Sequence, residues 1–125
     1  MSVLKAAICD DSMLVRKKLK ASLEALGVEV CVEATNGEEI VQKLTNNCNV
    51  DLLFLDIVMP IKTGIEALTE LKANETTKDL KVVMVTSVGT SKHVREAVKL
   101  GVYDFMQKPV DVEVLQNILD KAKGE

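Results

Sequence analysis

The chain has 125 residues, of which 47% are hydrophobic and 28% are charged, and its formal net charge is −3 at pH 7. These values are typical of one soluble globular domain, so we expect a single domain over residues 1–125. The acidic balance argues against broad attraction to nucleic acid, no apolar stretch approaches the roughly 20 residues that span a bilayer, and no signal-peptide layout is present, so we expect a cytoplasmic protein.

Apolar runs and amphipathic stretches alternate along the sequence, which is typical of repeated βα units around a parallel sheet. A helix is expected after each strand, because apolar residues recur there at helical spacing, as they do from Val15 to Leu26. The predicted architecture is therefore (βα)₅. The predicted strands are residues 4–9, 28–34, 51–56, 80–86 and 102–106.

The first helix is expected to end at Gly27, since glycine readily takes the backbone conformation that stops a helix. In the second strand, valines alternate with the other residues from Glu29 to Glu33, and this period of two predicts one wetter face. Asn36 is then expected to cap the second helix, with Glu39 placed to bond back to it.

The later elements carry similar signals. Thr63 and Glu66 have the spacing of a capping box for the third helix, the fourth helix is expected to end at Gly101, and Asp111 is expected to cap the fifth. Continuously apolar strands are buried on both faces, so the first, third and fourth strands should be central and the other two peripheral. This fits a doubly wound, flavodoxin-like α/β fold, with a five-stranded parallel sheet in the order 2-1-3-4-5 and helices on both faces.

Three carboxylates are expected to meet at one edge of this sheet. Ligands of such folds bind beyond the carboxyl ends of the strands, near the point where the strand order reverses. Asp10 and Asp11 follow the first strand, and Asp56 ends the third. Clustered carboxylates require a cation, and oxygen ligands with room for water and phosphate favour Mg²⁺ over zinc or calcium, although Mn²⁺ could replace it.

Two further polar groups reach the same edge. Thr86 ends the fourth strand and can donate a hydrogen bond to an oxyanion, and Lys108 follows the fifth and can pair with a charge on Asp56. Taken singly, these residues have simpler interpretations as turn residues or solvated cations, and Asp10 or Asp11 could be only a helix cap. Their convergence favours a site for phosphoryl transfer.

The sequence resembles response regulator receiver domains, and the resemblance covers essentially the whole chain. It is carried by Ile-Cys-Asp-Asp-Ser at residues 8–12, Leu-Asp-Ile-Val-Met-Pro at 55–60 with Gly64, Val-Thr-Ser at 85–87 and Phe-Met-Gln-Lys-Pro at 105–109. The family resemblance implies a phosphoacceptor switch of two-component signalling and no conventional enzyme, with intrinsic autophosphorylation and autodephosphorylation. The phosphoryl donor would be a sensor histidine kinase or a histidine phosphotransfer protein.

The same resemblance implies roles for the clustered residues. Asp56 would be the phosphorylation site, and Lys108 would neutralise the phosphoryl oxygens. Asp11, Asp56 and the backbone carbonyl of Val58 would bind Mg²⁺ directly. Asp10 would hold the ion mainly through water.

A conformational switch is implied as well. Thr86 would move towards the acyl phosphate, and Phe105 would turn inward, unless it is simply a core residue. The bond before Pro109 would be cis. Val58 and Val88 occupy two positions that tune the phosphoryl lifetime in this family, and because neither can orient a water molecule we expect slow hydrolysis.

Output is expected through a downstream protein that binds the surface of the fourth helix, fifth strand and fifth helix, because no residues follow the last helix to form an effector domain. The protein would be a monomer or a phosphorylation-dependent dimer, without direct nucleic-acid or membrane binding, and chemotaxis and phosphorelays are candidate pathways. Alternatively, the sequence is the excised N-terminal receiver of a larger regulator with a DNA-binding or enzymatic effector. Arg16, Lys17, Lys18 and Lys20 could contact an acidic partner or form a solvated helix face.

Two other functions fit the sequence less well. A phosphohydrolase with an aspartyl-phosphate intermediate usually has a second acid two residues after its nucleophile, and Val58 stands there. A flavodoxin-like nucleotide carrier needs a phosphate-binding loop after the first strand, where Asp10 and Asp11 would repel phosphate in the absence of a metal.

Overall fold

The computed structural model describes residues 3–87 and 91–124. Within these ranges, five strands alternate with five helices, so the predicted (βα)₅ architecture is confirmed. The strands are β1 (Lys5–Cys9), β2 (Glu29–Ala34), β3 (Leu52–Asp56), β4 (Lys81–Thr86) and β5 (Asp104–Gln107). The helices are α1 (Met13–Ala25), α2 (Gly37–Asn46), α3 (Gly64–Ala73), α4 (Ser91–Lys99) and α5 (Val112–Lys123). None of the described helices is long and apolar enough to cross a membrane.

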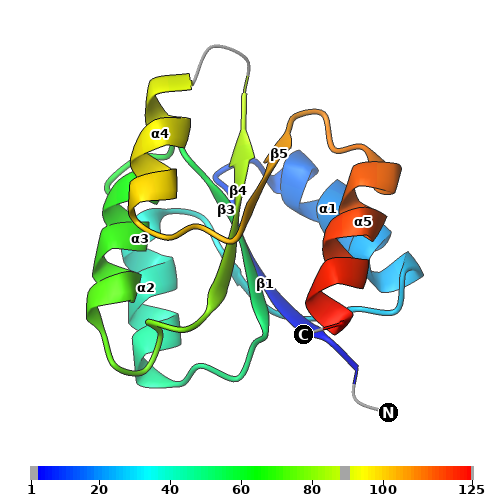
Figure 1. Cartoon of the computed structure of the whole chain (residues 1–125), viewed down its shortest axis with the longest axis horizontal. Helices are drawn as coiled ribbons and strands as arrows, with labels where there is room; N and C mark the ends of the chain where they lie inside the picture. Colours follow the sequence, from blue (N-terminus) through cyan, green and yellow to red (C-terminus); the bar gives the residue numbers. More distant parts are fainter. Residues whose placement is uncertain (1–2, 88–90, 125) are drawn as a thin grey trace.

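The strands form one parallel sheet in the order β2-β1-β3-β4-β5, as predicted. Helices α2, α3 and α4 cover one face, and α1 and α5 cover the other (Figure 1). A separate apolar cluster fills each layer. Each helix therefore buries its apolar side against the sheet, and burial of a single large side chain such as Phe54 contributes about 1.5–3 kcal/mol.

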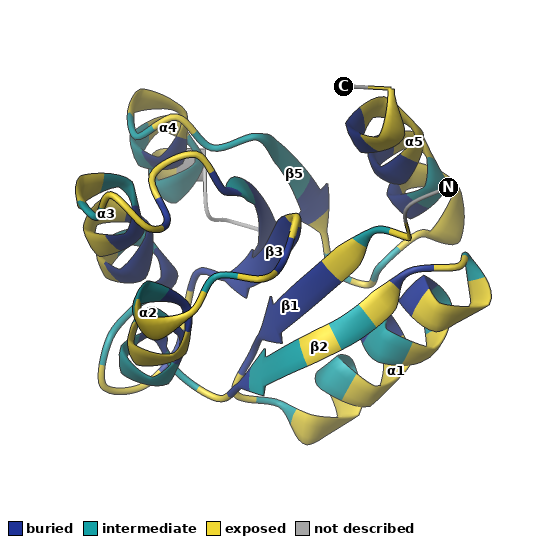
Figure 2. Cartoon of the chain, turned by 90° about the horizontal axis from the view of Figure 1, so that it is seen from below, coloured by how far each residue is buried: buried dark blue, intermediate teal, exposed yellow. Residues whose placement is uncertain are grey.

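The burial of the strands follows their apolar content. All five residues of β3 are buried, and only the first residue of β1 and of β4 is not. Most residues of β2 are intermediate or exposed, as Figure 2 shows. The predicted central and peripheral strands are thus confirmed, because only the central strands are covered on both faces.

The predicted alternation of exposure in β2 holds from Glu29 to Val32, but the two valines do not share one face. Ala6 pairs with Val30, but Ala7 pairs with Val32, so Cys31 forms a bulge. In a regular strand the two valines would share a face. With the extra residue between them, Val30 packs against the α1–α5 side and Val32 against the α2–α3–α4 side.

All five strands begin one or two residues later than predicted. At β2 and β5 the reason is the way in which a glycine ends the preceding helix. Gly27 has φ 85°, and the N–H of Val28 donates to the carbonyl of Leu23. Gly101 and Val102 repeat this arrangement at the end of α4. In this type of helix ending, the residue after the glycine closes the helix, so it is not free to start a strand.

The predicted helix caps are largely confirmed. Thr63 forms a reciprocal capping box with Glu66, and Asp111 caps α5. Asn36 caps α2, but the prediction that Glu39 bonds back to it is wrong. Glu39 accepts hydrogen bonds from the backbone N–H and the hydroxyl of Thr35, at 2.7 and 3.0 Å, one residue before the cap.

Candidate functional site

The carboxyl ends of β1 and β3 bring three acids together. Asp10 and Asp56 are buried, with 3% and 5% of their surface exposed, whereas Asp11 is exposed. Each contributes one carboxylate oxygen to a group in which all such atoms lie within 4.8 Å of one another. The three sequence-predicted carboxylates therefore share one site.

Asp10 is fixed from several directions. Its backbone N–H donates to the carbonyl of Ala34, and its Oδ1 accepts from the N–H of Ser12 at 2.9 Å. Ser12 itself caps α1, accepting from the N–H of Val15. Asp10 thus supports the cap without being the cap, and its Oδ2 faces the cluster.

Lys108 supplies the opposing charge. Its Nζ lies 2.9 Å from Oδ2 of Asp10 and 3.2 Å from Oδ2 of Asp56. Its N–H donates to the carbonyl of Thr86 at 2.7 Å, and its peptide bond to Pro109 is cis. Partial burial alone would lower the pKa of Lys108, but the bond to Asp10 and the charge of Asp56 raise it above its ordinary value, so the ammonium stays charged.

The surroundings of Asp56 disfavour its ionised form. Burial, and then the charge of Asp10, raise the pKa of Asp56 above its ordinary value, and they outweigh the opposite effect of Lys108. The Lys108 ammonium pairs with two of the three clustered carboxylates, so a further cation at this site would relieve the remaining repulsion. The all-oxygen donor set fits Mg²⁺, with two buried acids and one exposed acid leaving access for water and phosphate.

Thr86 and Phe105 lie on the neighbouring strands. The hydroxyl of Thr86 is buried and donates to the carbonyl of Met106 at 3.3 Å, so it is held by β5 and not by the acids. Phe105 is half-buried and packs against the apolar cluster on the α2–α3–α4 side of the sheet. The two residues are linked through Met106, which directly follows Phe105 in β5.

The loop after Asp56 contains features that the sequence interpretation missed. Ile61 is 80% exposed and has φ 69°. This φ and the hydrogen bond from the N–H of Lys62 to the carbonyl of Pro60, at 2.7 Å, define a γ-turn.

A Cβ atom at Gly64 would overlap the carbonyl oxygen of Asp56, so only glycine fits there. Val58 is 64% exposed, and Val88 lies outside the described residues.

The same loop is tied to the helices beside it. The carbonyl of Lys62 accepts from the N–H of Gly37, at the start of α2. The Lys62 ammonium pairs with Glu38 on α2, at 2.9 Å, and with Glu70 on α3. No local pattern in the sequence indicates these contacts, because the partners come from different elements.

Arg16 was expected to contact a partner or solvent, but its side chain is only 15% exposed and bonds within the molecule. Its Nη1 donates to the carbonyl of Asp10 at 2.7 Å, and its Nε lies 3.6 Å from Oε1 of Glu33. A basic residue of α1 is therefore part of the surroundings of the acidic cluster.

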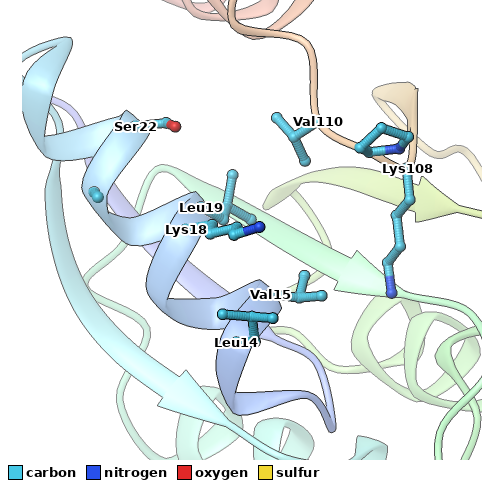
Figure 3. A pocket seen from close by; sticks show the side chains of 9 residues that line it. Leu14, Val15, Lys18, Leu19, Ser22, Lys108 and Val110 are labelled. Atoms are coloured by element: carbon cyan, nitrogen blue, oxygen red, sulfur yellow. The ribbon is translucent and has the colours of Figure 1, made fainter.

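A groove of about 670 Å³ lies beside the acids, between α1 and the loop after β5 (Figure 3). Lys108 contributes to both features, since its stem lines the groove while its ammonium reaches the carboxylates. The groove is mostly apolar, so it is distinct from the acidic cluster. Its lining residues are Leu14, Val15, Lys18, Leu19, Ala21, Ser22, Lys108, Pro109 and Val110.

Comparison with known proteins agrees with this geometry. The family model described as "Response regulator receiver domain" matches residues 6–120. The chain is 36% identical to the chemotaxis protein CheY of Listeria monocytogenes, over 96% of this chain and 98% of that protein. It is 31% identical to the chemotaxis protein CheY1 of Helicobacter pylori, over 97% and 98% of the two chains.

A solved structure gives the same result in three dimensions. The chain is similar to one chain in the crystal structure of the CheX-CheY-BeF₃-Mg²⁺ complex from Borrelia burgdorferi, with a TM-score of 0.87 and 29% identity. The match covers 96% of this chain and 89% of that one.

Proposed function

We infer the function of this chain from its family, because it belongs to the response regulator receiver domains. Receiver domains are phosphoacceptor switches of two-component signalling and are not conventional enzymes. For this chain, we propose that Asp56 is the acceptor and that a sensor histidine kinase or a histidine phosphotransfer protein is the donor. The observation that carries the proposal is the buried Asp56 carboxylate paired with Lys108 and adjoined by two further acids.

The proposed reaction is the transfer of one phosphoryl group. A carboxylate oxygen of Asp56 attacks phosphorus, and the P–O bond forms as the P–N bond to the donor imidazole breaks. The electron pair of that bond remains on the imidazole nitrogen. Lys108 neutralises the charge on Asp56 and then on the transferred oxygens, and this electrostatic stabilisation is the main contribution that a protein makes to phosphoryl transfer.

Mg²⁺ is the proposed cofactor. Asp11, Asp56 and the backbone carbonyl of Val58 would hold it directly, and Asp10 mainly through water. When bound, Mg²⁺ supplies positive charge that compensates the carboxylates and the phosphoryl oxygens. The clustering of the three acids supports this assignment.

The proposed response involves Thr86 and Phe105. Thr86 would exchange its bond to the Met106 carbonyl for one to a phosphoryl oxygen, and Phe105 would turn inward into the space that this vacates. This movement would change the surface formed by α4, β5 and α5. A downstream protein would bind that surface, and the CheX in the Borrelia complex is a partner of that relative.

Incubation with acetyl phosphate and Mg²⁺ tests the acceptor, with intact-protein mass spectrometry as the readout. The wild-type chain should gain the mass of one phosphoryl group, which also tests self-phosphorylation, and Asp56→Asn should gain none. Asp51→Asn is the matched control, because Asp51 is exposed and lies just before the start of β3. Equal labelling of the Asp56→Asn variant would identify another residue as the acceptor.

A further inference from the structure

We propose that Arg16 is a positioning residue for the metal site, which it serves by fixing the backbone of the loop between β1 and α1. The proposal rests on the proposed Mg²⁺ function of the acidic cluster. Arg16 touches none of the three carboxylates through a described bond. Its contact is with the main chain that carries two of them.

The Arg16 guanidinium connects the loop after β1 to the neighbouring strand β2. On one side, Nη1 donates to the carbonyl of Asp10, the first residue after β1, at 2.7 Å. On the other side, Nε faces Glu33 of β2 at 3.6 Å, and Lys20 holds the second oxygen of Glu33 at 3.5 Å. A guanidinium is suited to binding both partners, because its donors are spread over a planar group. A lysine ammonium would have to reach both partners from one nitrogen atom.

The carbonyl that Arg16 holds belongs to the peptide between two proposed metal-binding residues. The other polar atoms of Asp10 are already fixed, by Ala34, Ser12 and Lys108. The hydrogen bond from Arg16 holds the last of these atoms, the Asp10 carbonyl oxygen. It thereby fixes the orientation of the peptide plane between Asp10 and Asp11. Groups that orient metal ligands in this way typically change metal affinity by about 10–100-fold when they are removed.

Positioning and simple electrostatics predict opposite results. If Arg16 acted only as a nearby positive charge, its removal would reduce the repulsion of Mg²⁺ and tighten binding. If Arg16 acts by holding the loop, its removal lets the Asp10–Asp11 peptide reorient and weakens binding. The sign of the change therefore distinguishes the two roles.

The test is titration calorimetry of the full chain with Mg²⁺ at fixed ionic strength, together with thermal unfolding in EDTA. Arg16→Met keeps most of the aliphatic stem and loses the guanidinium, and its Mg²⁺ affinity should fall about tenfold. Lys17→Met removes one charge from an exposed position on the same helix, and its affinity should stay unchanged or rise slightly. Arg16→Lys keeps the charge without the planar fork, and its affinity should fall several-fold.

Mg²⁺ affinity in Arg16→Met equal to or tighter than that of the wild type would overturn the proposal, including the case in which only thermal stability falls. If Arg16→Met does not fold, wild-type affinity in Arg16→Lys overturns it instead. If Arg16→Met binds Mg²⁺ as tightly as the wild type and still accepts a phosphoryl group, only the positioning role of Arg16 is refuted, and the proposed function stands. Failure of the wild-type chain to bind Mg²⁺ would refute the proposed metal site together with the positioning role.

Discussion

The ammonium of Lys108 lies 3.2 Å from Oδ2 of Asp56, although the two residues are 52 positions apart in the sequence. The contact joins the end of β3 to the loop after β5, across the end of β4. It does not fully compensate the acid, because burial and then Asp10 still hold the pKa of Asp56 above its usual range. The ionised Asp56 carboxylate is therefore stabilised by Lys108, but its charge still lowers the stability of the fold.

This cost predicts that Asp56→Asn stabilises the metal-free protein. An acid whose pKa is higher in the folded state than in the unfolded state stabilises the fold at pH values below its unfolded-state pKa. This stabilisation is lost as the pH rises through the folded-state pKa. At pH 7 in EDTA, Asp56→Asn should raise the Tm by about 3 °C or more, roughly the effect of 1 kcal/mol in a chain of this size. The gain should shrink near pH 4, about the ordinary carboxyl pKa. Scanning calorimetry at both pH values checks this, and a lower Tm for the variant at pH 7 would contradict it.

Thr86→Val should separate phosphorylation from the response. The variant keeps the shape of the side chain but loses the hydroxyl bond to Met106, which should cost about 1 kcal/mol in urea unfolding. Asp56 should still accept a phosphoryl group, while the change at Phe105 is lost. Fluorophenylalanine labelling reports this directly, because the sequence contains only two phenylalanines and the core residue Phe54 serves as a reference.

Thr86→Ser is the control for that experiment, since it keeps the hydroxyl. Its Phe105 signal should shift on treatment with beryllofluoride and Mg²⁺, as in the wild type. A full shift in Thr86→Val would show that the hydroxyl is not needed for the response.

Gly64→Ala should be severely destabilising. The added Cβ would overlap the carbonyl oxygen of Asp56, so the strand end or the loop must move, at a cost of about 3 kcal/mol. Gly124→Ala is the matched control, because its Cβ would find neighbours no nearer than 3.6 Å, and its stability should change by only about 0.5 kcal/mol. Urea unfolding compares the two, and equal stabilities would show that the tight approach at Gly64 is unimportant.

Val58→Asn should shorten the life of the phosphorylated state several-fold. Val58 is 64% exposed two residues after Asp56, the proposed acceptor, and its side chain cannot orient an attacking water, whereas an amide can. A dephosphorylation time course of purified protein measures the change. Val3→Asn provides the control, since Val3 is also exposed, at 57%, but precedes β1. A wild-type half-life of a few seconds that Val58→Asn leaves unchanged would contradict the prediction.

The fold and the meeting of the acids could be predicted because both depend on local patterns. Apolar runs locate the strands, and the carboxyl ends of parallel strands lie at one edge of a sheet, so Asp10, Asp11 and Asp56 had to approach one another. The glycines that end helices and most of the helix caps could be predicted for the same reason, because they are short motifs with fixed spacing.

The remaining features depend on choices that spacing does not determine. A bulge at Cys31 shifts the register without any glycine or proline to mark it. Glu39 could reach Asn36 or Thr35, and the geometry of the turn selects Thr35. Arg16 was ambiguous because a long cationic side chain reaches solvent and main chain equally well, and only the folded position of the Asp10 carbonyl decides between them.

The γ-turn at Ile61 belongs to a loop whose ends are joined by the bond from the N–H of Gly64 to the carbonyl of Ile57. Within this loop, Lys62 bonds to the neighbouring helices α2 and α3. On the opposite flank, Thr86 is held through its side chain by one hydroxyl bond to Met106. A new negative group on Asp56 would therefore have a loop held by several contacts on one side and a side chain held by one hydroxyl bond on the other. We therefore expect the first displacement at the Thr86 side chain, which would give the signal a direction before any partner binds.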